Sequence, residues 1–226
     1  MALKLFEEVL LLALKDEKGT VSVDFLEYAL AGSIISELVL AGAVAIDSSK
    51  QKRVSSLNAK PCGDDILDEA MSLIRERENT KGLQHWIGKI ASIKNLKERV
   101  ALRLCDAKIL KAEQEKVFLI FNRDVYPELD PVPEQNIIAR IDDAITGKSA
   151  QIDARTVVLI SIAHGVGLLR HNFDRDKLKR YKSRIEQIAK GEMVGGITRE
   201  VIDACQAAVF IAVIMPTLIT TVVVTS

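Results

Sequence analysis

The stretch VDFLEYALAGSIISELVL, residues 23–40, is rich in alanine and leucine, and its apolar residues recur at helical spacing. Gly42 follows this helix and closes it. A shorter apolar helix precedes it over residues 3–14, with Glu7 and Glu8 on one face, and stops at the turn Asp16 to Gly19. The first part of the chain therefore predicts two successive helices and indicates a helical fold.

Helical periodicity continues to the carboxyl terminus, and the sequence predicts a mainly α-helical protein of about nine helices in one globular domain, residues 1–226. The seven later helices are expected at residues 65–78, 82–90, 93–104, 134–146, 153–169, 175–190 and 198–215. Two short β-hairpins are also expected. Residues 43–47 pair with 54–57, and a second ribbon contains the run Val117 to Phe121.

The composition is that of an ordinary globular protein, with 48% hydrophobic and 27% charged residues among 226. The 31 basic residues balance 31 acidic ones, so no overall field draws the protein to nucleic acid or lipid. Any such attraction must come from local clusters. The 3 cysteines are widely separated, lack zinc-binding spacing and indicate reduced thiols in a cytosolic protein.

One local cluster lies where the helix of residues 93–104 precedes the second ribbon. An apolar stripe of this helix is expected to face the core: Ile93, Leu96, Val100 and Leu104. Lys94 and Lys97 share the outward face. The run VFLIF, residues 117–121, is rich in strand formers and leads into a polar tip, Asn122-Arg123-Asp124. An anionic membrane would bind an apolar ribbon beside a cationic helix; equally, alternate residues of the run could face the core.

The two ends of the chain bear on membrane targeting. Glu7 and Glu8 lie too early, and the apolar stretch after them is too short, for a secretory signal. Residues 207–226 contain no charge. The favoured interpretation is a buried last helix that ends near Met215, followed by a β-prone tail, and a membrane anchor is the alternative.

No motif for catalysis or metal binding stands out. His85, His164 and His171 come without a third metal ligand, and His164 is expected to pack in the core. Four acidic residues fit the positive end of the dipole of the 65–78 helix: Asp64, Asp65, Asp68 and Glu69. The sequence therefore predicts a protein that is not an enzyme and that needs no metal and no cofactor.

A second basic cluster runs from Arg170 to Arg184, with 7 cations against 2 carboxylates. It could bind phosphate groups of lipid or nucleic acid, but the favoured interpretation is a solvated helix face. A nucleic-acid- or protein-binding module, which would use the helix of residues 93–104 and the ribbon in a winged-helix manner, is the alternative function.

Several short motifs occur in a defined order between residues 5 and 210. They are LLLAL at 10–14, LAG at 30–32 leading to Glu37-Leu38 and Gly42, GD at 63–64 with LDEA at 67–70, FLIF at 118–121, and AH at 163–164 with Leu168 and Phe173. Together they resemble the Golgi phosphoprotein 3 family. The resemblance implies a mostly α-helical domain around a central hydrophobic helix and, as in eukaryotic members, a peripheral membrane protein that binds phosphatidylinositol 4-phosphate.

The resemblance also implies a site. Lys94 and Lys97 match positions where eukaryotic members carry basic residues of the lipid-phosphate pocket. Ala31 stands where those members have an arginine, and no tryptophan lies near residue 22. Arg123 is expected as a third phosphate contact. The expected membrane contacts are Phe118, Leu119, Ile120 and Phe121.

The partner implied by the resemblance is an anionic membrane lipid, a phosphoinositide above all. Client membrane proteins, in a sorting or adaptor role, and self-association remain open, and nucleic acid is not expected. The implied location is cytoplasmic and peripheral on a membrane surface, which in a eukaryote would be the cytosolic face of the Golgi.

Overall fold

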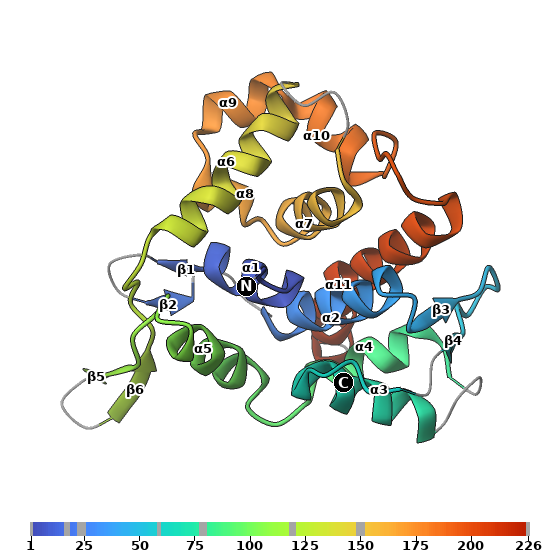
Figure 1. The fold of residues 1–226 in the computed structure, drawn as a ribbon, viewed down its shortest axis with the longest axis horizontal. Coiled ribbons are helices and arrows are strands. Elements are labelled where there is room, and N and C mark those ends of the chain that lie inside the picture. Colours follow the sequence, from blue (N-terminus) through green and yellow to red (C-terminus); the bar gives the residue numbers. More distant parts are fainter. Residues whose placement is uncertain are drawn as a thin grey trace.

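The structure is a computed structural model that describes residues 2–15, 19–21, 26–57, 60–76, 81–117, 121–147 and 152–224. Within these ranges the chain forms eleven helices and three antiparallel two-stranded ribbons (Figure 1). The helices are α1 (Leu5–Ala13), α2 (Leu26–Leu40), α3 (Asp65–Glu76), α4 (Leu83–Ala91), α5 (Leu96–Asp106), α6 (Val132–Thr146), α7 (Ala154–Gly165), α8 (Leu169–Asn172), α9 (Arg175–Arg180), α10 (Lys182–Ala189) and α11 (Arg199–Val224). The strands are β1 (Leu14–Lys15), β2 (Thr20–Val21), β3 (Val44–Ile46), β4 (Val54–Ser56), β5 (Glu113–Val117) and β6 (Phe121–Val125).

Helices α1 and α2 lie at the centre of the molecule, with the other helices around them (Figure 1). All nine residues of α1 are buried, and twelve of the fifteen in α2. Helices α1, α4, α7 and α11 pack against α2, while α5 and α6 contact α1. One cluster of buried apolar side chains extends from Leu5 to Ala212. The prediction of a mainly α-helical fold around a central hydrophobic helix is confirmed.

Helix α2 can be buried on every side because its residues are mostly apolar around the whole helix and are small where neighbouring helices come close. A methyl group placed on Gly32 would lie 2.8 Å from the Cβ atom of Ala212, so the glycine lets α11 approach. The hydroxyl of Ser33 donates to the carbonyl of Leu30 over 2.8 Å, which satisfies a polar group without any outside partner. Gly165 likewise makes room for Val213, between α7 and α11.

Three glutamates on the central helices are buried, and each faces an arginine from another helix. The pairs are Glu7 with Arg103 of α5 (3.1 Å), Glu8 with Arg140 of α6 (2.9 Å) and Glu37 with Arg155 of α7 (2.7 Å). Burial raises the pKa of the Glu8 carboxyl above its ordinary value even though Arg140 lowers it. The polar face predicted on the first helix is therefore inside the protein, where it binds other helices.

The helix expected over residues 175–190 is broken into α9 and α10. Tyr181, with φ −101° and ψ 14°, separates them, and the Asp174 carboxylate caps α9 by accepting from the amide of Asp176 over 2.9 Å. The helix expected over residues 153–169 also ends early, at Gly165, and α8 follows as a separate turn. Side-chain periodicity does not detect breaks of one to three residues, which explains why these helices were expected to be continuous.

Helix α11 runs to Val224, so the prediction that it ends near Met215 is wrong. Pro216 has no backbone N–H to donate, and a helix can continue past a proline by bending at that point. The side chains of Ile202, Cys205 and Ala212 are buried, as expected for the first part of this helix. Across the ranges that the structure describes, no helix combines the length and the apolar character needed to cross a membrane.

The close approach of α2 and α11 can be tested at Gly32. We expect Gly32→Ala to lower the free energy of unfolding by about 1–3 kcal/mol, because the added methyl group overpacks against Ala212. In the double variant Gly32→Ala/Ala212→Gly the loss should be smaller than the sum of the two single losses. Urea unfolding of the four proteins measures this coupling, and strictly additive losses would contradict the contact.

Candidate functional site

The start of α5 carries the two lysines predicted to bind a lipid phosphate. The predicted apolar stripe of this helix is buried: Ile93, Leu96, Val100 and Leu104. The helix begins at Leu96 rather than Ile93, because Asn95 has a left-handed backbone with φ 54°, a conformation that asparagine tolerates. Lys94 therefore lies in the turn between α4 and α5, and Lys97 lies in the first turn of α5.

The two lysines differ in their surroundings. Lys94 is exposed and has no ion-pair partner within the described part of the chain. The side chain of Lys97 is 31% exposed, and its Nζ atom lies 3.4 Å from the carboxylate of Glu98. A surface pair of this kind contributes roughly 0–1 kcal/mol. Both ammonium groups can therefore meet an anion at little energetic cost.

The β5–β6 hairpin follows α5 and projects from the same side of the molecule (Figure 1). Its register runs from Glu113 opposite Val125 to Val117 opposite Phe121. Val125 and Tyr126 are buried at the base, and Gln114 Nε2 donates to the Asp124 carboxylate over 3.3 Å. The base of the hairpin is thus attached to the core by buried side chains.

This register corrects the predicted tip. Asn122, Arg123 and Asp124 belong to β6, whereas residues 118–120 connect the two strands. Phe118, Leu119 and Ile120 lie outside the described residues. For Phe121 and Arg123 the backbone is described, opposite Val117 and Glu115, but the side chains are not. The strand propensity of VFLIF predicted an extended run but not where the chain turns, since the anchored base sets the register.

A cleft of about 430 Å³ lies between α5 and the hairpin. Its lining residues are Asn95, Glu98, Leu102, Ala112, Glu113, Gln114, Asp124 and Tyr126. Three of these are carboxylates and none is a cation, so the cleft repels a phosphate group. Lys94 and Lys97 are not part of the lining. An anion would meet these lysines outside the cleft.

Arg99 and Arg103, one helical turn apart on α5, form an ion-pair network that sequence analysis did not identify. The pairs are Arg103 with Glu7 (3.1 Å), Asp64 (2.6 Å) and Asp65 (3.2 Å), and Arg99 with Asp65 (2.8 Å) and Glu69. The Arg103 guanidinium also lies 5.4 Å above the ring of Phe6. The two arginines join α5 to α1 and α3. The four-residue spacing of the two arginines, together with the acidic cluster at Asp64 to Glu69, could have indicated this network in the sequence.

Asp64 both caps α3 and pairs with α5. Its carboxylate accepts from the amides of Ile66 and Leu67, each over 3.1 Å. Burial alone would raise the pKa of this carboxyl, but the hydrogen bonds from Arg103 and the two amides outweigh burial and hold the pKa below its ordinary value of 3.8. The acids that were predicted to complement the helix dipole are thus also neutralised by arginines.

The structure does not bring the three histidines together. His164, expected in the core, is exposed like His171, because α7 ends at Gly165 and its last turn reaches the surface. His85 instead packs edge-on against Trp86, with ring centroids 4.9 Å apart. Among the residues with described positions, no group of three or more His, Cys, Asp or Glu side chains could hold a metal ion.

These features define a helical domain whose central helices are buried and whose β5–β6 hairpin projects beside the lysines at the amino-terminal end of α5. The sequence model of one family, Golgi phosphoprotein 3 (GPP34), matches residues 5–205. The chain therefore belongs to the GPP34 family. Vacuolar protein sorting-associated protein 74 from Eremothecium gossypii is 27% identical over 223 residues, which cover 82% of this chain and 67% of that protein.

Variants of Asp64 separate its capping role from its ionic role. We expect Asp64→Asn, which keeps a capping oxygen, to lower the free energy of unfolding at neutral pH by about 1.5–3 kcal/mol, since it loses the charged hydrogen bond to Arg103. Asp64→Ala should lose about 1 kcal/mol more, the usual cost of a lost cap. Urea unfolding of the three proteins measures both steps.

The pH dependence supplies the control for this comparison. The folded-state pKa of Asp64 lies below 3.8, so its ionic contribution is complete above about pH 4 and disappears as the pH falls through the folded-state value. The stability difference between the wild type and Asp64→Asn should therefore shrink on acidification. A difference that stays constant or grows would contradict the assigned ion pair.

Proposed function

We propose that this protein is a peripheral membrane protein that binds anionic lipid headgroups through Lys94 and Lys97, with the connection between β5 and β6 in contact with the bilayer. The observation that carries the proposal is the placement of both lysines at the start of α5, beside the hairpin, in a chain of the GPP34 family. The role is binding and requires no catalysis. Arg123 is a further phosphate contact in this proposal.

Local charge supports this assignment. The protein is neutral overall, so its attraction to a membrane must come from exposed cations that are not already paired. Lys94 meets this condition among the described residues, and Lys97 pairs with Glu98 at the surface. The arginines of the same helix, Arg99 and Arg103, are already paired with carboxylates of the protein and are not available to a lipid phosphate.

The chain connection between the strands supports a bilayer contact. The three residues that join β5 to β6 are Phe118, Leu119 and Ile120, all large and apolar. Burying one such side chain contributes about 1.5–3 kcal/mol. A hairpin with these residues between its strands in the sequence and a base attached to the core is suited to shallow insertion, together with Phe121 at the start of β6.

The headgroup in this proposal is a phosphoinositide such as phosphatidylinositol 4-phosphate, bound with loose selectivity. Ala31 is fully buried and supplies no charge, and the two lysines act as point charges rather than as the planar fork of arginine. The relative's name refers to vacuolar protein sorting, and sorting of membrane clients at the cytosolic face of a membrane, the Golgi in a eukaryote, is the corresponding role.

Nucleic acid is the less favoured partner. The cleft that separates the hairpin from α5 carries Glu98, Glu113 and Asp124, which would repel a phosphate backbone laid across helix and ribbon. Retention of duplex DNA without any affinity for anionic vesicles, at the same salt concentration, would reverse this preference.

The lysine contact can be tested with Lys94→Ala/Lys97→Ala. We expect roughly thirtyfold weaker binding to phosphatidylcholine vesicles that contain phosphatidylinositol 4-phosphate, because each of the two cations contributes about 1 kcal/mol near an anionic surface. Phosphatidylserine vesicles of equal charge should bind the wild type comparably. The matched control is Lys190→Ala/Arg199→Ala, which removes two exposed charges elsewhere. Unchanged co-sedimentation of the folded Lys94/Lys97 variant would reject the site.

Insertion of the hairpin can be measured with a single added tryptophan. Trp86, the one native tryptophan, is 2% exposed and should not respond to vesicles. Leu119→Trp should show a blue-shifted emission and quenching by brominated lipids when anionic vesicles are added, because the ring leaves water. The control Leu57→Trp replaces an exposed leucine beyond β4. A response from Leu57→Trp and none from Leu119→Trp would place the membrane contact elsewhere.

A further inference from the structure

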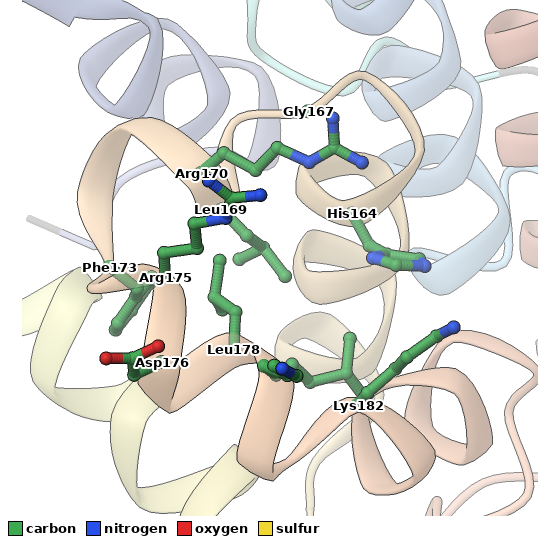
Figure 2. A pocket seen from close by; sticks show the side chains of 11 residues that line it. His164, Gly167, Leu169, Arg170, Phe173, Arg175, Asp176, Leu178 and Lys182 are labelled. Atoms are coloured by element: carbon green, nitrogen blue, oxygen red, sulfur yellow. The ribbon is translucent and has the colours of Figure 1, made fainter.

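A cleft of about 820 Å³ lies between the end of α7 and the short helices α8, α9 and α10 (Figure 2). This volume is typical of small-molecule sites. The charged side chains of its lining all come from the basic run Arg170 to Arg184, which sequence analysis interpreted as a solvated helix face. The turn at Phe173 and Asp174 instead folds α9 back, so that Arg170 of α8 shares one cleft with side chains of α9 and α10.

The floor of the cleft is apolar. Leu169 and Ile185 are each 3% exposed, and Phe173 and Leu178 are partly buried. Leu169 and Leu178 lie between the charged side chains that surround them (Figure 2). A ligand that reaches this floor removes hydrocarbon from water, which favours an apolar chain over a purely ionic molecule.

The rim of the cleft is cationic. Arg170, Arg175, Lys179 and Lys182 contribute to it, against one carboxylate, Asp176. In the part of the chain that the structure describes, Arg170, Arg175 and Lys179 have no ion-pair partner, and Lys182 lies 3.8 Å from the exposed Glu186.

These rim cations contrast with the arginines near the core. Arg103, Arg140 and Arg155 each meet a buried carboxylate. Cations left without counter-charges around an apolar floor define a site for an anion that carries a hydrocarbon group.

We propose that this cleft binds a single-chain amphiphile with an anionic head, a fatty-acid-like molecule whose carboxylate or phosphate meets Arg170 and Arg175 while its chain covers Leu169, Leu178 and Ile185. The ligand is a free molecule rather than a bilayer surface. The site is concave, and the exposed large apolar side chains of the described residues lie on other elements: Leu57, Leu102, Leu129, Val132 and Phe210. The stretch Arg170 to Arg184 thus has no exposed large apolar side chain that could insert into a bilayer beside the cations.

Isothermal titration with dodecanoate below its critical micelle concentration tests the proposal on the full chain. We expect saturable binding at one site. Octanoate, with the same head and a shorter chain, should bind at least about tenfold more weakly, because it covers less of the floor. Inorganic phosphate should show no saturable binding. Failure of dodecanoate to bind, or equal binding of octanoate or phosphate, would overturn the proposal.

Charge variants assign the binding to this cleft. Arg170→Gln/Arg175→Gln should weaken dodecanoate binding by about tenfold or more, since both exposed guanidinium groups are lost. Lys190→Gln/Arg199→Gln, which removes the same charge outside the cleft, should stay within about twofold of the wild type. Equal losses in both variants, or loss of vesicle or duplex DNA binding in the first variant with dodecanoate unaffected, would also overturn the site.

This site is independent of the proposed membrane contact. Lys94→Ala/Lys97→Ala should bind dodecanoate like the wild type, and Arg170→Gln/Arg175→Gln should bind vesicles like the wild type. Failure of one site is therefore distinguishable from failure of the other. Circular dichroism of each variant confirms that it is folded.

Discussion

The buried carboxylates of the two central helices constrain the rest of the structure. Glu7, Glu8 and Glu37 lie inside, and each meets an arginine from a different surrounding helix. Removing the arginine of such a pair costs about 3–5 kcal/mol, because the carboxylate stays buried without a counter-charge. Glu37 also accepts from the amide of Leu5 over 3.1 Å, so it holds the start of α1 against α2. These pairs join α5 and α6 to α1, and α7 to α2.

This constraint divides the cations of α5 into two groups. Arg99 and Arg103 meet several carboxylates and fix the helix to α1 and α3, a task that suits the planar guanidinium with its several donors. Lys94 and Lys97 lie at the exposed start of the helix, where a flexible ammonium can exchange one anion for another. The rigid part of the helix thereby positions the part proposed to bind lipid.

The hairpin is held by a different kind of contact. Gly19 has φ +55°, and its carbonyl accepts from the amide of Tyr126 over 3.0 Å. Any side chain at Gly19 would collide with the backbone of Tyr126 and Pro127, so glycine is required at this approach. The base of the hairpin is thus fixed by a backbone contact with the turn residue Gly19, immediately before β2 and over 100 residues earlier in the chain. The proposed bilayer contact depends on this remote turn.

Residue periodicity was enough to predict the helical fold, the burial of α2 and the core-facing stripe of α5, because burial repeats along a helix with the period of its side chains. Three features could be seen in the folded protein alone: Glu8 is inside against Arg140, Asn122 to Asp124 form a strand rather than a tip, and Arg170 shares a cleft with Lys182. Each of these features depends on contacts between residues of different elements, and a periodic pattern records how one element is buried but not which partner it meets.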